Sequence, residues 1–238
     1  MAEVDKPLVT VTGISGYAGS QVALAFLQDG GFRVRGTVRD RNNAAKIQPL
    51  RECFGELFDQ MELVEADLLD DASLIAAVAG AKFVVHVASP FTRSTEESEL
   101  VTPAVEGTKS IMRACHANGV RRCVITSSCA TVIYPFEEPE GLYTEETWSD
   151  VRNPKVMAYS KSKILAERAA WDFIAELPEA ERFELVTILP SFILGPALRT
   201  ESSISIDFCR TLLDGVAKEV VYRRLPCVDV RDLAVAHI

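Results

Sequence analysis

The amino-acid sequence predicts an α/β protein whose central sheet is parallel and doubly wound. Short apolar runs alternate with helical patterns through the first half of the chain, and a glycine-rich turn joins the first run to the first helix. The composition, with 238 residues of which 48% are apolar and 25% charged, is that of a globular protein with a sizeable core. An alternating β-α order favours parallel strands with helices on both faces of the sheet.

Each element of the first half follows from a local pattern. Residues 8–12 are apolar and β-branched, which is typical of a buried strand. Residues 18–29 repeat apolar side chains at helical spacing and precede Gly30 and Gly31, a helix stop signal. The same two patterns predict strands at 33–38, 61–64, 82–87 and 122–126, and helices at 43–54, 73–79 and 97–118.

The regular alternation ends after residue 127. Residues 136–150 contain six acidic residues and no basic one, together with Pro139 and Gly141, and are expected to form a solvated loop. Helices are expected at 156–176, 204–213 and 229–238, a strand at 183–189 and a loop at 190–196. No internal repeat or low-complexity tract interrupts this pattern.

Charge and composition argue against several classes of function. The 34 acidic residues outnumber the 25 basic ones and leave a net charge of −9, which disfavours nucleic acid or an anionic membrane as the main partner. The longest uncharged run, 7–28, is interrupted by glycines and polar residues, so neither a membrane span nor a signal peptide is expected. The six cysteines include no Cys-x-x-Cys pair and are expected to be buried free thiols in a cytoplasmic protein. The three histidines lack metal-ligand spacing, so no metal site is predicted.

A glycine-rich turn follows the first predicted strand. Gly13, Gly16 and Gly19 lie between that strand and the first predicted helix. Glycines in such a turn let the backbone approach a diphosphate, which then faces the N–H groups and the positive dipole end of the helix. A plain βα turn is the alternative, but the strand, the spacing, the helix and the N-terminal position together favour a dinucleotide-binding turn.

The end of the second predicted strand indicates which dinucleotide is bound. Arg39 and Asp40 follow this strand. An acidic residue at this position binds the ribose hydroxyls of NAD, whereas an arginine accommodates the 2′-phosphate of NADP. Arg39 comes first, and Arg41 and Lys46 add positive charge that a phosphate favours. We therefore expect NADP rather than NAD, with an exposed basic helix face as the alternative.

Two side chains of the predicted helix at 156–176 are candidate catalytic groups. Tyr159 and Lys163 are four residues apart and share one helical face. A nearby ammonium lowers the pKa of a phenol, which suits a tyrosine to general acid catalysis, and the same lysine can hold the ribose hydroxyls of a nucleotide. The common alternative for a Tyr-x-x-x-Lys sequence is an ordinary surface helix.

Hydroxyl side chains follow the predicted strand at 122–126. Ser127 and Ser128 reach the carboxyl edge of the sheet, where ligands bind in open parallel sheets. A hydroxyl there can donate a hydrogen bond to a substrate carbonyl oxygen as negative charge develops on it. A turn-forming serine is the alternative. A Ser–His nucleophile is disfavoured because no base is adjacent in the sequence, and His86, on an apolar strand, is expected to be structural.

Together these segments resemble a known family. The chain resembles the extended short-chain dehydrogenase/reductases, in particular the branch of dihydroflavonol reductases, cinnamoyl-CoA reductases and ketone or aldehyde reductases such as methylglyoxal reductases. The matching segments are VTGISGYAG at 11–19, RGTVRD at 35–40, ADL at 66–68, HVASP at 86–90, ITSS at 125–128, YSKSK at 159–163, LPS at 189–191 with GP at 195–196, and VDVRDLA at 228–234. They occur in the order of the family and span nearly the whole chain.

The resemblance implies a Rossmann dinucleotide-binding domain at residues 1–190 and a small C-terminal substrate lobe at 191–238, interleaved with the last sheet elements. This lobe is apparently incomplete, because family members continue past residue 238. It implies NADPH-dependent reduction of an aldehyde or ketone, with Tyr159 as proton donor, Lys163 as its electrostatic and ribose partner, and Ser128 as hydrogen-bond donor to the carbonyl. The cofactor-binding residues that it implies are Gly13, Ser15, Gly16, Tyr17 and Ala18 in the glycine turn, Arg39 and Lys46 at the 2′-phosphate, Asp67 and Leu68 at the adenine, Val87, Ala88 and Ser89 along the fourth strand, Thr126, Tyr159 and Lys163, and Pro190, Ser191 and Ile193 beside the nicotinamide.

Two alternatives stay open within this resemblance. One is an NAD-dependent epimerase, dehydratase or dehydrogenase of nucleotide sugars or sterols, which shares the glycine turn and the Tyr159–Lys163 pair. The other is a non-catalytic NADP-binding interaction protein, although such proteins usually lack the tyrosine or the lysine. Dihydroflavonol reductases carry a flavonoid-binding Asn at the place of Ile133, so a different carbonyl substrate is expected here.

Overall fold

The central sheet contains six strands in the order β3-β2-β1-β4-β5-β6. The computed structural model describes residues 6–90, 96–133, 142–198, 203–216 and 226–238. The strands are β1 (Leu8–Thr12), β2 (Arg33–Val38), β3 (Met61–Glu65), β4 (Phe83–His86), β5 (Arg122–Thr126) and β6 (Glu184–Ile188). All neighbouring strands of this sheet run parallel, which confirms the predicted doubly wound α/β architecture.

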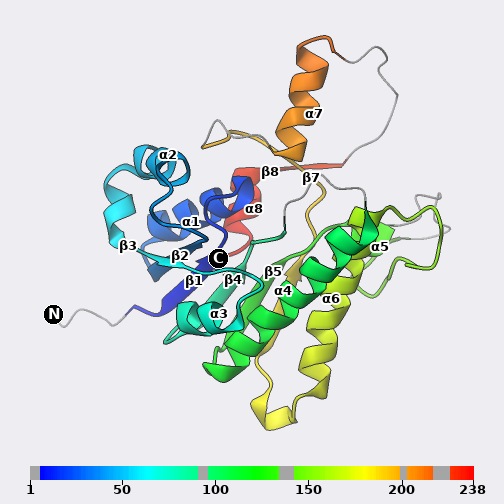
Figure 1. Ribbon diagram of the computed structural model, residues 1–238, viewed down its shortest axis with the longest axis horizontal. Helices are drawn as coiled ribbons and strands as arrows, with labels where there is room; N and C mark the ends of the chain where they lie inside the picture. Colours follow the sequence, from blue (N-terminus) through cyan, green and yellow to red (C-terminus); the bar gives the residue numbers. More distant parts are fainter. Residues whose placement is uncertain (1–5, 91–95, 134–141, 199–202, 217–225) are drawn as a thin grey trace.

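Helices cover both faces of the sheet (Figure 1). The core on one face is covered by α3 (Asp71–Val78), α4 (Glu97–Ala117) and α6 (Ala158–Glu176), and the core on the other by α1 (Tyr17–Asp29), α2 (Ala44–Phe54) and α8 (Val230–Val235). These helices are confirmed, although α8 is shorter than predicted. The short helices η1 (Gly55–Gln60), α5 (Ala130–Ile133) and η2 (Glu179–Glu181) were not predicted.

Strand β1 shows why the sheet is buried on both faces. Val9 and Val11 are fully buried in the core beneath α1 and α2, whereas Leu8 belongs to the core beneath α3 and α4. Thr10 lies on the α3 side, where its hydroxyl donates a hydrogen bond to the Ala77 carbonyl at 3.2 Å. Burying one such aliphatic side chain contributes about 1.5–3 kcal/mol, so this continuous apolar run stabilises the sheet from both sides.

The chain reverses its direction of travel across the sheet between β1 and β4. From β1 it adds β2 and β3 on one side, and it then crosses back to place β4 on the other side of β1. Thr12, the last residue of β1, pairs in register with His86, the last residue of β4. Ligands of open α/β sheets bind at the carboxyl ends of strands at such a switch point, so the loops after β1 and β4 are the first candidates for a site.

A second, two-stranded sheet lies apart from the first. It pairs β7 (Phe192–Leu194) with β8 (Cys227–Asp229) in parallel, and α7 (Ile204–Leu213) packs near it through an edge-on contact of Phe208 with Phe192 at 5.3 Å between ring centroids (Figure 1). The prediction of a loop at 190–196 was therefore wrong. Three residues carry too short a pattern for a strand, and their partner lies more than thirty positions along the chain.

The acidic loop expected at 136–150 is described in part. The described part of the expected loop, residues 142–150, contains no helix or strand, and residues 136–141 lie outside the described residues.

The prediction of buried cysteines holds in part. Cys115 and Cys123 are buried as predicted, but Cys53 and Cys227 are exposed. Within the described ranges no helix combines the length and the apolarity needed to cross a bilayer. In the same ranges no three His, Cys, Asp or Glu side chains gather as metal ligands would.

Candidate active site and cofactor-binding site

The turn between β1 and α1 is shaped by its glycines. Gly13 has a left-handed φ of 70°, which favours glycine, and its carbonyl accepts a hydrogen bond from the Gly16 N–H at 2.9 Å. A Cβ on Gly13 would lie 2.8 Å from the Ala88 Cα, and a Cβ on Gly19 would lie 2.3 Å from the Gly13 carbonyl oxygen. The backbone of the turn therefore lies directly against the residue that follows β4 by two positions and against the first turn of α1.

The first turn of α1 is suited to an anion. Its N-cap is Gly16, which has no side chain to cap the helix, and the turn contains no acidic residue. The N–H groups and the positive end of a 13-residue helix are thus left without a side-chain cap or an acidic residue in their own turn. Ser15, Tyr17 and Ala18 lie in or beside this turn, as predicted from the sequence. The turn fits the diphosphate of a dinucleotide.

Basic and acidic residues follow β2, and both were candidates for binding the ribose end of the cofactor. Arg39 directly follows the strand and is exposed, and Lys46 lies in the first turns of α2. The Asp40 carboxylate accepts a hydrogen bond from the Asn42 N–H at 2.8 Å, so it caps its own turn. The Arg41 guanidinium lies 3.9 Å from the Glu65 carboxylate, which draws it back toward β3. Binding of a phosphate beyond β2 by Arg39 and Lys46 stays a prediction.

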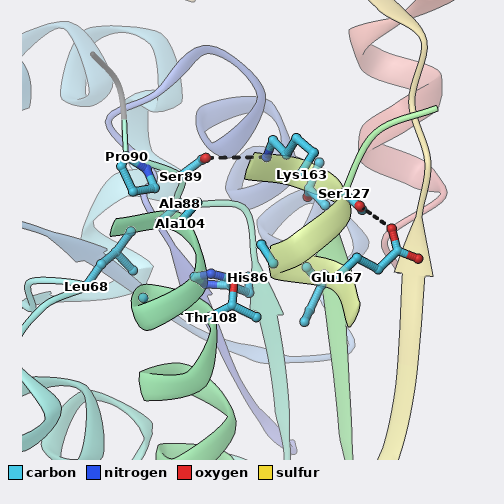
Figure 2. Close-up of a pocket in the computed structure, with 14 residues that line it drawn as sticks. Leu68, His86, Ala88, Ser89, Pro90, Ala104, Thr108, Ser127, Lys163 and Glu167 are labelled. Atoms are coloured by element: carbon cyan, nitrogen blue, oxygen red, sulfur yellow. Dashed lines mark hydrogen bonds between the residues drawn. The ribbon is translucent and has the colours of Figure 1, made fainter. Parts of the chain in front are cut away.

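A pocket opens at the carboxyl ends of β4 and β5, beside α4 and α6 (Figure 2). Five of the predicted site residues line it, and they are Leu68, Ala88, Ser89, Thr126 and Lys163. The ammonium of Lys163 donates a hydrogen bond to the Ser89 hydroxyl at 3.3 Å and so joins α6 to the segment after β4. Burial lowers the pKa of Lys163 to about 8, against the opposing effect of the Glu167 carboxylate.

Tyr159 and Ser128 lie close to this pocket in the chain but are not among its lining residues. Tyr159 is the second residue of α6, one helical turn before Lys163, and its side chain is 45% exposed. Ser128 is buried two residues after the end of β5, where its hydroxyl oxygen accepts a hydrogen bond from the Ala130 N–H at 3.2 Å. The same hydroxyl also hydrogen-bonds the Cys129 side chain.

Hydrogen bonds join the end of β5 to the end of β6. The Ser127 N–H donates to the Ile188 carbonyl at 2.8 Å, and the Cys129 N–H donates to the Pro190 carbonyl at 3.0 Å. These bonds bring the predicted residues Pro190 and Ser191 next to the serine pair. Ile193 lies beyond them in β7.

Two of the predicted cofactor residues use their hydroxyls elsewhere. The Tyr17 hydroxyl donates to the Gly195 carbonyl at 2.9 Å, so it fastens the glycine turn to the segment after β7. The Thr126 hydroxyl lies 2.8 Å from Nε2 of His237, whose Nδ1–H donates to the Leu233 carbonyl at 2.7 Å. Because Nδ1 carries the proton, Nε2 of the neutral ring accepts from Thr126.

The remaining two predicted cofactor residues lie after β3 and β4. Asp67 lies in the turn after β3, where its carboxylate accepts a hydrogen bond from the Leu69 N–H at 2.9 Å. Val87 is half-buried beside the core under α1.

The pocket also contains polar side chains beyond those five, among them His86, Ser127 and Glu167. Ser127 was one of the two candidate hydroxyls, whereas Glu167 was not predicted. His86 was expected to be structural, and its Nδ1 does lie 2.9 Å from the Thr12 hydroxyl, which also accepts from the Ala88 N–H at 3.1 Å. Glu167 is buried and accepts a hydrogen bond from Ser127. A signal for Glu167 existed, because it follows Lys163 by four positions and Tyr159 by eight, which places all three on one helical face.

The buried imidazole of His86 predicts a pH-dependent stability. Burial, assisted by the charge of Lys163, lowers the pKa of His86 to about 3 from an ordinary value of 6.5. Below pH 6.5 the unfolded chain binds a proton that the folded chain does not, so stability falls as the pH falls toward 3. Between pH 7 and pH 5 the loss is about 2 kcal/mol from this residue. Urea unfolding of the wild type and His86→Gln should show a difference that changes with pH by about this amount, whereas parallel curves would contradict the assignment.

The glycine turn, the switch-point pocket and the doubly wound sheet define a protein of the Rossmann class. The chain belongs to the NAD dependent epimerase/dehydratase family, whose model matches residues 9–238. It is 37% identical over 243 residues to dihydroflavonol 4-reductase of Zea mays, covering 98% of this chain and 66% of that protein. It is 38% identical over 242 residues to cinnamoyl-CoA reductase 1 of Petunia hybrida, covering 100% of this chain and 70% of that protein.

Solved structures give the same result. The yeast methylglyoxal/isovaleraldehyde reductase complexed with NADPH matches with a TM-score of 0.83 and 26% identity, covering 97% of this chain and 72% of that one. Vestitone reductase from alfalfa matches with a TM-score of 0.79 and 28% identity, covering 98% of this chain and 72% of that one. These matches confirm the predicted branch of the family. The chain spans about two thirds of the length of the curated relatives that it matches.

Proposed function

We propose that this chain carries the cofactor-binding and catalytic part of an NADPH-dependent reductase that converts an aldehyde or ketone to an alcohol. The observation that carries the proposal is the position of Lys163. One helical turn after Tyr159, its ammonium enters the switch-point pocket and meets Ser89, beside the glycine turn. The relatives support the class of reaction, since they are named reductases.

The residues around the glycine turn fit the cofactor. The uncapped start of α1 would hold the diphosphate, Arg39 and Lys46 the 2′-phosphate, and Lys163 the ribose next to the nicotinamide. When bound, NADPH supplies the hydride for the carbonyl carbon. The NADPH complex of the yeast reductase supports this choice of cofactor.

The proton that the carbonyl oxygen needs is supplied by a side chain on α6, and a side chain after β5 assists its transfer. Tyr159 donates its phenolic proton to the carbonyl oxygen, and the Ser128 hydroxyl donates a hydrogen bond to the same oxygen while charge develops on it. The Lys163 ammonium stabilises the phenolate that remains on Tyr159. The carbonyl thus gains a hydride on carbon and a proton on oxygen, and the product is an alcohol.

The second sheet and α7 belong, in this proposal, to the substrate side of the protein. Residues 1–190 form the dinucleotide-binding domain, and residues 191–238 contribute part of a substrate lobe that is interleaved with this domain, because α8 packs against the core under α1. Ile133 on α5 is half-buried and apolar at the place where dihydroflavonol reductases carry an Asn. An apolar side chain cannot hydrogen-bond a polyhydroxylated substrate, so we infer a smaller or less polar carbonyl compound than a dihydroflavonol.

The direct test is oxidation of NADPH in the presence of small aldehydes, diketones and aryl ketones. Turnover of at least one compound, with the matching alcohol as product, is the expected result. Copurification of tightly bound NAD, with no turnover of any carbonyl, would instead favour an epimerase or dehydratase. Binding of NADPH with no turnover, and no effect of Tyr159→Phe on the cellular role, would favour a non-catalytic binding protein.

The choice between NADPH and NADH depends on Arg39. The Arg39→Ala variant should lose about 10- to 100-fold in its preference for NADPH, because a charge-assisted contact to the 2′-phosphate is removed. The ratio of kcat/KM for the two cofactors measures this effect. Arg41→Ala is the matched control, since its guanidinium lies toward Glu65, and it should leave the ratio unchanged. An unaltered ratio in Arg39→Ala would refute the assignment.

A further inference from the structure

Glu167 is a buried carboxylate in the wall of the candidate active site. Its side chain is 5% exposed, and it lies on α6 one helical turn beyond Lys163, so that both side chains line the same pocket (Figure 2). A buried carboxylate is costly unless hydrogen bonds or an opposite charge compensate it. The neighbours of Glu167 therefore indicate what the residue is for.

Three side chains donate hydrogen bonds to Glu167. Ser127 donates to Oε2, Thr187 on β6 donates to Oε1 at 3.0 Å, and the Trp171 indole donates to Oε1 at 3.4 Å. These three hydrogen bonds compensate the burial of the carboxyl group. Glu167 thus ties α6 to the end of β5 and to β6 at a single point.

The charges that face this carboxylate are few. Of the described residues that line the pocket, Lys163 and Glu167 are the two that are charged at neutral pH, because the buried His86 on β4 stays neutral. Tyr159 on α6 is the titratable group one turn before Lys163. On α4, Glu97 contacts Lys161 at 2.8 Å instead. The carboxylate is therefore the anion of the pocket wall, and it acts on the Lys163 ammonium through space, since the ammonium points to Ser89 and the carboxylate to Ser127 (Figure 2).

We propose that Glu167 is a positioning residue for the reduction: it fixes the turn that carries Ser128, through its bond to Ser127, and it keeps the Lys163 ammonium charged. This role rests on the proposed function. Without the carboxylate, the Ser127 hydroxyl and the indole of Trp171 lose their acceptor, and Lys163 is left desolvated beside neutral groups. The first consequence affects the turn that carries Ser128, and the second affects the charge of Lys163.

The charge on Lys163 can be measured without turnover. Lysines labelled with ¹³C at Cε report their own protonation by NMR, and Lys163→Arg identifies the resonance of Lys163. In the wild type this pKa is expected at about 8. Glu167→Gln should lower it by at least about half a pH unit, because an opposing negative charge is removed at nearly constant shape. Glu97→Gln, which removes the exposed carboxylate beside Lys161, is the control and should leave it unchanged.

Measurements of kcat against pH then separate the effect of Glu167 on Lys163 from its effect on the turn that carries Ser128. In Glu167→Gln the alkaline limit of kcat should move to lower pH with the lysine, whereas Ser127→Ala should reduce kcat by at least about tenfold at every pH and leave the Lys163 pKa in place. An unchanged Lys163 pKa in Glu167→Gln, or full turnover in Ser127→Ala, would overturn the corresponding part. If the wild type reduces no carbonyl compound, the proposed function fails, and the NMR titration still decides whether Glu167 controls Lys163. If Glu167→Gln does not fold, Glu167→Asp takes its place, and it should retain the Lys163 pKa while losing kcat as Ser127→Ala does.

Discussion

The Tyr159→Phe variant is expected to reduce NADPH-dependent carbonyl turnover by roughly 10²- to 10⁴-fold, the usual contribution of a general acid. The substitution removes one hydroxyl from a side chain that is 45% exposed at the start of α6. Little packing is lost, so the fold and the affinity for NADPH should be nearly unchanged. Steady-state kinetics with the best substrate of the panel gives kcat, and quenching of NADPH fluorescence gives the dissociation constant.

Lysine variants of the same helix provide the control for this experiment. Lys163 contacts Ser89 inside the pocket, whereas Lys161 pairs with Glu97 on α4 at 2.8 Å. Lys163→Met should lower kcat and weaken NADPH binding, because both the phenolate and the ribose lose their cationic partner. Lys161→Met should change neither. If Tyr159→Phe keeps more than about a tenth of wild-type turnover, Tyr159 is not the proton donor.

The sequence predicts the main sheet well because each of its strands carries a local signal. Val9, Val11, Val84 and Val85 are buried in the core, and a strand with both faces covered is apolar along its whole length. The glycine turn is also marked by a local pattern, and Gly19 is required by its close approach to Gly13 in the same turn, although Gly13 itself packs against the distant Ala88. Local rules therefore suffice for β1 to β6 and for the start of the cofactor site.

The second sheet and the inner wall of the pocket depend on long-range contacts. Phe192 and Cys227 pair across more than thirty residues in strands of three residues each, and no local pattern marks them. Glu167 was missed for a related reason. A glutamate on a helix is most often solvated, and its burial follows only once Ser127 and Thr187 are placed beside it by β5 and β6.

The glycine turn allows a test in which backbone strain and packing are separated. Gly13 and Gly30 both have a φ of 70°, so alanine at either position adopts an unfavourable left-handed conformation. A Cβ on Gly30, at the C-terminus of α1, would have no neighbouring atom within 4 Å, whereas a Cβ on Gly13 would lie 2.8 Å from the Ala88 backbone. The two variants therefore share the strain, and Gly13→Ala alone forces the end of β4 away from the turn.

Gly30→Ala is expected to lower the free energy of unfolding by about 1–2 kcal/mol and to leave the NADPH dissociation constant unchanged. Gly13→Ala should lower the free energy of unfolding by a further 1–3 kcal/mol or so, because the overpacked atoms are backbone and cannot rotate away. It should also weaken NADPH binding by at least about tenfold, since the displaced contact joins the diphosphate turn to the segment that carries Ser89, the partner of Lys163. Urea unfolding and NADPH titration measure the two effects. Equal losses of stability and of affinity in the two variants would mean that the contact between the turn and β4 does not shape the cofactor site.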